Sequence, residues 1–205
     1  MKPIKNIFII ALLLINVNST FAQTDKLTLA FSKSYEYESK KNYTLAVSSI
    51  KEIYDPKSYE ANIRLGWLYY LLAQYKESMS YYQIAINIMP YSIEAKFGYV
   101  YPAAALGNME QVINQYNKIL QIDPQNSTAN YRMGLIYYDK KDYTSAYKYF
   151  EKVVNLYPFG YDALIMYAWT NYQTGKTREA KILFNKVLML SPYDKSALEG
   201  LSLIK

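Results

Sequence analysis

From Tyr59 onwards the chain repeats a pattern every 34 residues, four times in succession. Each period closes with a proline, at Pro90, Pro124, Pro158 and Pro192. An aromatic residue recurs with the same spacing, at Tyr82, Tyr116, Phe150 and Phe184. A fixed period of this length predicts helical hairpins that stack on one another, because a single hairpin cannot bury its own apolar face.

The residue types that are missing restrict the chemistry of the chain. Its 205 residues include no cysteine and no histidine, which excludes disulfides and removes most transition-metal sites. Cysteine nucleophiles and Ser/His or Cys/His catalytic pairs are excluded as well. Gly175-Lys176-Thr177 lacks the upstream glycine of a phosphate-binding loop, so Gly175 is predicted to lie in a turn. We therefore expect no enzyme activity, no cofactor and no metal site.

The positive charge of the chain does not form a nucleic-acid-binding surface. The formal net charge is +6, and two of these charges, Lys2 and Lys5, lie in the leader described next. Lysine and glutamate are interspersed in the remainder, whereas nucleic-acid binding usually needs a basic stripe on one face. We expect no nucleic-acid partner.

Residues 1–22 have the features of a secretory signal peptide. A positive start is followed by the apolar run Ile7–Ile15 and by the small-residue exit Thr20-Phe21-Ala22. The apolar run is too short to span a bilayer, which takes about 20 residues. We expect a mature chain that starts at Gln23, has no integral membrane segment, and is exported to the periplasm or secreted from a bacterium. The alternative is an uncleaved anchor.

Each period contains two helical patterns separated by a short polar break. The first pattern carries pairs such as Leu65-Gly66 and Met133-Gly134, a small residue such as Ala146 follows in the second, and the aromatic residue and proline come last. This order resembles the tetratricopeptide repeat family. The resemblance implies an all-α fold, a right-handed α-solenoid of about five helix-turn-helix repeats. The repeats would be residues 27–58, 59–92, 93–126, 127–160 and 161–194.

The two ends of the array are expected to differ from its middle. The first repeat, 27–58, closes early at Pro56, as expected of a terminal repeat with one face in water. After the last repeat, residues 195–205 carry Ala197, Leu198, Leu201 and Ile204 at helical spacing. They predict a capping helix, so that residues 23–205 form one repeat domain.

Two features depart from the family motif. The tryptophan expected at position 4 of each period is missing, and the residues there are Asn62, Lys96, Asn130 and Leu164. The period 93–126 has Pro102 inside its first helix, where proline removes a backbone donor and predicts a kink. This kink is either a tolerated irregularity or a bend that widens the binding groove.

The resemblance implies that the first helices of the repeats line a concave groove that binds a peptide. Aromatic residues fall on these groove positions, and tyrosine and tryptophan suit recognition surfaces because they join a large apolar face to a polar tip. The candidate partner-binding residues are Phe31, Tyr35, Trp67, Tyr70, Phe97, Tyr101, Tyr131, Tyr138, Trp169 and Tyr172. The alternative is that these rings only pack against neighbouring helices.

Some members of the family hold a terminal carboxylate with lysine and asparagine at fixed groove positions, and this chain has neither residue there. Arg64 and Arg132 stand nearby, either to pair with an acid or as surface charges. We do not predict a carboxylate clamp.

The resulting hypothesis is an exported, non-catalytic scaffold that binds a protein or peptide partner in an aromatic groove. The alternative ligand is a glycan or cell-wall polysaccharide, because sugar rings also stack on aromatic faces. Self-association through the convex face or the terminal helix is left open.

Overall fold

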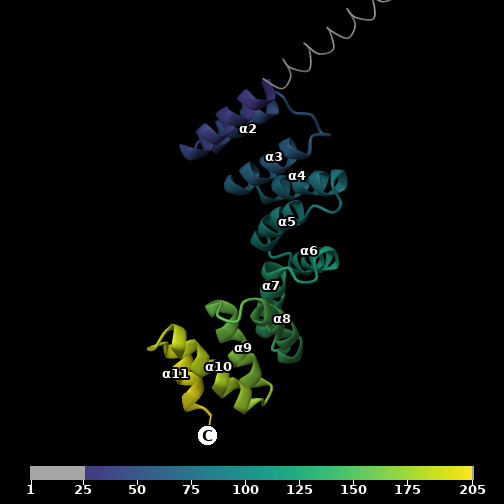
Figure 1. The fold of residues 1–205 in the computed structure, drawn as a ribbon. Helices are drawn as coiled ribbons and strands as arrows, with labels where there is room; N and C mark the ends of the chain where they lie inside the picture. Colours follow the sequence, from purple (N-terminus) through teal and green to yellow (C-terminus); the bar gives the residue numbers. More distant parts are fainter. Residues whose placement is uncertain (1–25, 205) are drawn as a thin grey trace, which may run out of the picture. The chain divides into compact units, whose positions relative to one another are not determined.

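The computed structural model describes residues 26–204, and these residues form helices and turns without a strand (Figure 1). The all-α prediction is therefore confirmed for this part of the chain. The signal peptide expected for residues 1–22 lies outside the described residues. Across residues 26–204, every helix is too short or too polar to cross a membrane.

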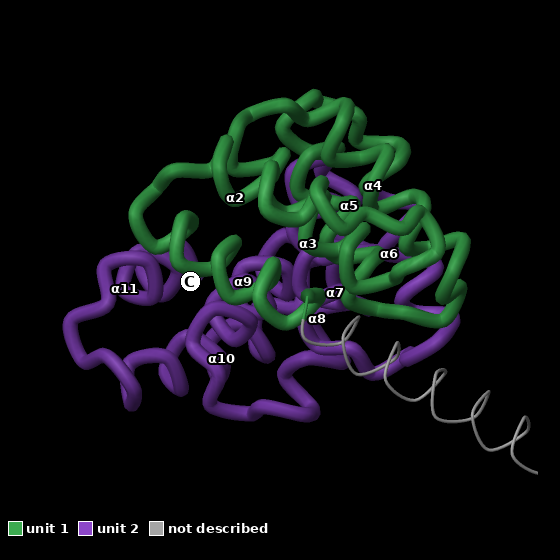
Figure 2. The backbone as a smooth tube through the Cα atoms, turned by 90° about the horizontal axis from the view of Figure 1, so that it is seen from above, with its two compact units in different colours: residues 1–112 green, residues 113–205 purple. Residues whose placement is uncertain are grey.

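The chain divides into two compact units, unit 1 up to Val112 and unit 2 from Ile113 (Figure 2). Unit 1 begins with a helix over residues 26–39, followed by α2 (Tyr43–Lys51), α3 (Tyr59–Leu71), α4 (Tyr75–Ile88) and α5 (Ile93–Ala105). The division falls inside α6 (Met109–Ile122). Unit 2 contains α7 (Ser127–Asp139), α8 (Tyr143–Leu156), α9 (Tyr161–Gln173), α10 (Thr177–Leu190) and α11 (Lys195–Ser202).

The helices pack as pairs joined by short turns. The helices of three pairs, α3 with α4, α7 with α8, and α9 with α10, lie against each other, and α10 also packs against α11. The turns need a left-handed backbone, which Gly107 and Gly175 supply with φ of 72° and 77°. Gly175 thus lies in the turn between α9 and α10, as predicted.

Polar side chains cap the starts of α3, α5 and α7. The side chains of Ser58, Ser92 and Asn126 accept hydrogen bonds from the backbone N–H groups three residues later, at 3.0–3.1 Å. Tyr59 adds a link to the next repeat, because its hydroxyl lies 2.7 Å from the Ser92 hydroxyl. The start of one first helix is thereby tied to the start of the next.

The recurring aromatic residue fills a space that glycines leave open. A Cβ atom at Gly66 would lie 2.9 Å from the Tyr82 ring, and a Cβ atom at Gly98 would lie 2.1 Å from the other edge of the same ring. In unit 2 a Cβ atom at Gly200 would lie 2.2 Å from the ring of Phe184. The Tyr82 ring therefore packs against glycine both in its own repeat and in the following helix, and the Phe184 ring packs against glycine in the following helix. These close contacts fix the distance between neighbouring helices.

The residue at position 4 has a structural role that replaces the missing tryptophan. The Asn130 amide donates to the carbonyl oxygens of Pro124, at 3.1 Å, and Asn126, at 2.9 Å. The Lys96 ammonium group donates to the equivalent carbonyls of Pro90 and Ser92. These buried polar side chains hold the loop that precedes the helix, which accounts for a polar residue where the family motif has an aromatic one.

Pro102 does not end the helix in which it lies. It is buried, and α5 continues past it to Ala105. Because proline has no N–H, the one hydrogen bond that residue 102 would donate to the carbonyl of Gly98 is lost.

Candidate functional site

A cavity of about 520 Å³ lies in unit 1, between the helix 26–39, α3 and the first turn of α5. Three of the predicted groove residues line it: Phe31, Tyr35 and Trp67. The other lining residues are Glu38, Tyr59, Glu60, Ile63, Arg64 and Glu94. The cavity thus combines aromatic walls with four charged side chains.

Arg64 forms the base of this cavity and is not a surface charge. Its side chain is only 5% exposed and forms an ion pair with Glu38. Its Nε atom donates to the Ser34 hydroxyl at 3.0 Å, and its guanidinium carbon lies 3.9 Å from the centroid of the Tyr35 ring. Its acidic partner is a residue of the chain itself, so Arg64 is not the surface charge that was one of the two alternatives. Arg132 is exposed, as a surface charge would be.

Trp67 connects the cavity to a row of further rings. Its indole N–H donates to Glu38 at 2.7 Å, and its ring stacks on Tyr70 with centroids 5.7 Å apart. Tyr70 in turn contacts Tyr101, at 5.8 Å between centroids. These three predicted residues therefore lie side by side on α3 and α5. Tyr35 and Tyr101 are the most accessible of the ten candidates, at 56% and 51% exposure.

Two carboxylates at the cavity were missing from the predicted site. Glu94 accepts a hydrogen bond from the Tyr59 hydroxyl at 3.0 Å, and Glu60 accepts one from the Ser58 hydroxyl at 3.1 Å. Burial is the main cause that raises the pKa of Tyr59, so this phenol stays protonated and donates. Both glutamates occupy the second position of a period, and this shared position is the sequence signal that would have identified them.

The predicted groove residues of unit 2 are more strongly engaged in packing. The Trp169 indole N–H donates to the Ser196 hydroxyl at 2.7 Å, and its ring meets the buried ring of Phe184 at 5.1 Å. Tyr131 lies 6.0 Å from the ring of Phe150 and borders a second cavity, of about 440 Å³. Tyr138 and Tyr172 are also half-buried, as is Phe97 in unit 1. None of the ten candidate side chains is fully buried.

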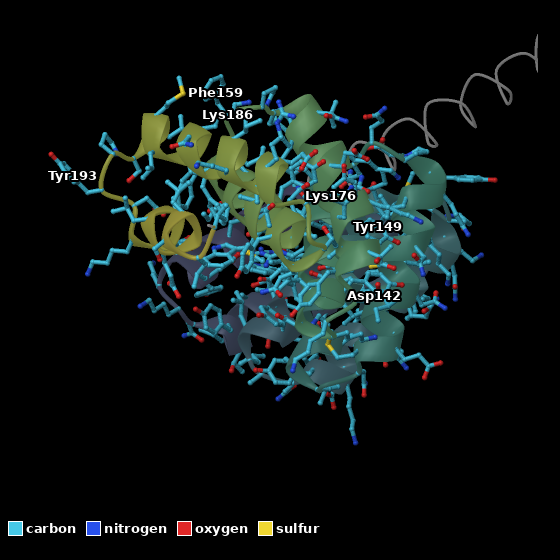
Figure 3. The ribbon with its side chains drawn as sticks, turned by 90° about the horizontal axis from the view of Figure 1, so that it is seen from below. Asp142, Tyr149, Phe159, Lys176, Lys186 and Tyr193 are labelled. Atoms are coloured by element: carbon cyan, nitrogen blue, oxygen red, sulfur yellow. The ribbon has the colours of Figure 1, made fainter. Side chains whose placement is uncertain are left out.

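A second group of exposed aromatic residues lies outside the predicted groove. Each follows a closing proline: Tyr91 is 83% exposed, Tyr193 is 88% exposed, and Phe159 is also exposed. In Figure 3 Tyr193 projects away from the ribbon, and Phe159 lies beside Lys186, whose ammonium is 4.6 Å from its ring. The proline–aromatic pair at the 34-residue spacing is the signal that would have found this group.

The described residues do not assemble a metal site. Within residues 26–204 there is no group of three or more acidic, histidine or cysteine side chains that could hold a metal ion. The aromatic faces, the carboxylates and the paired guanidinium of the site are groups suited to recognition.

Comparisons with known proteins agree with this architecture. Sequence models described as "Tetratricopeptide repeat" match residues 59–90, 127–159 and 161–194, while the irregular period 93–126 lies outside these matches. No curated protein sequence gives a significant match.

Solved structures share the fold at low sequence identity. A tetratricopeptide repeat protein from Parabacteroides merdae is 23% identical, with a TM-score of 0.73 over 87% of this chain and 72% of that chain. A MamA protein is 18% identical, with a TM-score of 0.69 over 81% of this chain and 92% of that chain. MamA from Desulfovibrio magneticus RS-1 is 17% identical, with a TM-score of 0.68 over 83% of this chain and 98% of that chain. These likenesses confirm the predicted repeat fold.

Proposed function

The chain belongs to the tetratricopeptide repeat family, and from that premise we propose that it is an exported, non-catalytic scaffold that binds a protein or peptide partner through the aromatic side chains of its first helices. The repeat fold is generally a protein-interaction scaffold. Export is proposed from the leader-like residues 1–22. The aromatic groove is proposed from the side chains described above.

One observation carries the proposal, the cavity of unit 1 and the row of rings beside it. Tyr70 contacts both Trp67 and Tyr101; Trp67 and Tyr70 are half-buried and Tyr101 is exposed, so the outer faces of these rings remain available to a ligand. The indole N–H of Trp67 is held by Glu38, so the ring is oriented before a partner arrives. Such preorganisation lowers the entropy that binding costs.

The experiment places a photo-crosslinking amino acid at single positions in the chain, in the cells that produce it. Crosslinkers at Tyr35 and Tyr101 are expected to capture one protein, identified by mass spectrometry. The matched control is Tyr91, which is aromatic, highly exposed and outside the proposed site. Equal capture of the same protein from Tyr91 would count against the assignment.

Substitution gives the complementary test. Trp67→Ala and Trp169→Ala are expected to weaken capture by about tenfold or more, as is usual for aromatic anchors of an interface. Tyr91→Ala serves as the control and should leave capture unchanged. If both tryptophan variants capture the partner as the natural chain does, with unchanged helicity, the groove assignment is wrong.

The glycan alternative rests on the half-exposed rings of Tyr35 and Tyr101, on which a sugar could stack. Calorimetric titration with cell-wall oligosaccharides tests it directly. Saturable binding that Tyr35→Ala and Tyr101→Ala abolish would favour this ligand over a protein.

A further inference from the structure

The cavity of unit 1 carries more carboxylates than cations. Glu38 is compensated, because it pairs with Arg64. Glu60 and Glu94 are exposed at the same cavity, and within residues 26–204 neither forms an ion pair with a lysine or arginine. The hydrogen bonds that they accept come from neutral hydroxyl groups. A positively charged ligand group complements this cavity, whereas an anion would be repelled.

The walls of the cavity also favour a cation. Phe31, Tyr35, Tyr59 and Trp67 line it, and the face of an aromatic ring attracts a nearby ammonium or guanidinium group. The chain provides an example at this site, since the guanidinium of Arg64 already lies on the Tyr35 ring, 3.9 Å from its centroid. Aromatic faces combined with carboxylates are the chemistry that recognises lysine and arginine side chains.

Arg64 supplies an observation that points to a peptide rather than a free amine. Its Nη2 atom is buried and has no hydrogen-bond partner among the described residues. A buried donor without an acceptor is destabilising. A main-chain carbonyl of a bound segment would supply that acceptor once the half-exposed ring of Tyr35 moves aside.

We propose that this cavity receives a lysine or arginine side chain of the partner, so that the scaffold recognises a basic segment of a protein. The inference rests on the function proposed above and names the chemistry of its ligand. The cation lies among the aromatic walls, with Glu60 and Glu94 as its counter-charges. The adjoining main chain of the segment faces Arg64.

The first test uses small probes and the full 205-residue chain labelled with nitrogen-15. The chain has two tryptophans, so a Trp67→Phe variant identifies the indole N–H signal of Trp67 in the NMR spectrum. Nα-acetyl-arginine amide is expected to shift this signal saturably. Its neutral isostere, Nα-acetyl-citrulline amide, should bind at least about tenfold more weakly, because it lacks the charge. Equal binding of the two probes, tighter binding of Nα-acetyl-glutamate amide, or no saturable shift with the arginine probe overturns the inference.

The second test removes the counter-charges. The double variant Glu60→Gln/Glu94→Gln keeps the side-chain shapes and is expected to bind the arginine probe about tenfold more weakly, because each exposed charge contributes modestly. The control is Glu77→Gln, an exposed glutamate in the first turn of α4 that does not line the cavity. Circular dichroism checks that the variants remain helical. Unchanged affinity in the folded double variant overturns the inference.

Capture of the crosslinked partner separates this inference from the proposed function. Capture that is lost in Trp67→Ala but unchanged in Glu60→Gln/Glu94→Gln overturns the basic-segment inference and leaves the scaffold function in place. Loss of capture in both variants supports both. Unchanged capture in Trp67→Ala counts against the proposed groove. The NMR titration with the arginine probe then tests by itself whether the cavity binds a basic side chain.

Discussion

The Tyr82 ring occupies the space in which a side chain at Gly98 would lie, since a Cβ atom there would be 2.1 Å from the ring. Gly98→Ala is therefore expected to destabilise unit 1 even though alanine is the better helix former. Overpacking of this kind costs up to about 3 kcal/mol, against a gain of about 1 kcal/mol in helix propensity. We expect a net loss of about 2 kcal/mol in urea unfolding followed by circular dichroism.

The control for this prediction is the same substitution beside a smaller neighbour. Tyr82→Leu removes the ring, so Gly98→Ala in that background should cost much less. If the Gly98→Ala single variant is as stable as the natural chain, α4 and α5 move apart to accommodate the added methyl group at no cost in stability, and the prediction is wrong.

Asn62 and Asn130 should differ in their contribution to stability, although they occupy the same position of their repeats. The Asn62 amide donates to two carbonyls, and its oxygen accepts from the Tyr54 hydroxyl at 2.9 Å. The Asn130 oxygen is buried without a partner among the described residues. We expect Asn62→Leu to cost about 2–3 kcal/mol and Asn130→Leu about 1 kcal/mol or less, because the latter also removes an unsatisfied acceptor. Chemical unfolding of the two variants compares their free energies of unfolding.

Leucine fits at this position, because Leu164 occupies it in another repeat of the natural chain. An equal or larger loss in Asn130→Leu would contradict the reasoning.

The ion pair of Arg64 with Glu38 should be costly to break on one side only. Arg64→Met leaves Glu38 at a cavity that already contains Glu60 and Glu94, and the loss is expected to be about 2–4 kcal/mol. The double variant Arg64→Met/Glu38→Leu should recover much of this loss, because no uncompensated charge remains. Thermal unfolding of the single and double variants gives the coupling free energy between Arg64 and Glu38. Additive losses would mean that the pair contributes little.

Alkaline pH should unfold the chain through its buried phenols. Burial is the main cause that raises the pKa of Tyr82 and of Tyr167, so the folded state favours the neutral form of both. A raised phenol pKa means that the contribution is fully present below the unfolded value of about 10 and is lost as pH rises above it. Without histidine or cysteine, stability should be nearly flat between about pH 6 and pH 8.

The check is unfolding free energy as a function of pH, together with phenolate absorbance. Tyr82→Phe keeps the ring that packs against the glycines and removes the ionising hydroxyl, so its stability should decline less steeply above pH 10. The same steep decline in Tyr82→Phe would assign the alkaline loss to other groups.

The periodic part of the fold could be predicted because the 34-residue repeat is visible in the sequence itself. The spacing of Tyr82 and Phe150 identified rings that are buried between helices, and the polar breaks identified the turns. Gly98 was not recognised, because its importance depends on a ring in the preceding repeat. The Arg64–Glu38 pair was not predicted for a similar reason: it joins residues 26 positions apart on different helices, and only their packing brings them together.

The candidate site shows the same limit. Aromatic residues on the first helices could be assigned by their position in the repeat. The sequence could not predict which of these residues line the same cavity, because that depends on how the helix 26–39 packs against α3. Glu60 and Glu94 were not predicted, and each lies in the first turn of its helix, where a glutamate also stabilises the helix itself.

Trp67 belongs to unit 1 and Trp169 to unit 2, and the chain contains no other tryptophan. Each indole is partly buried and hydrogen-bonded to a side chain on another helix, so its emission should shift to longer wavelength when that helix pair opens. Excitation of the 25 tyrosines would also pass energy to the nearer indole while a unit is folded. The chain thus carries one natural fluorescent reporter in each unit, and two single-tryptophan variants would reveal whether the units melt together or in sequence.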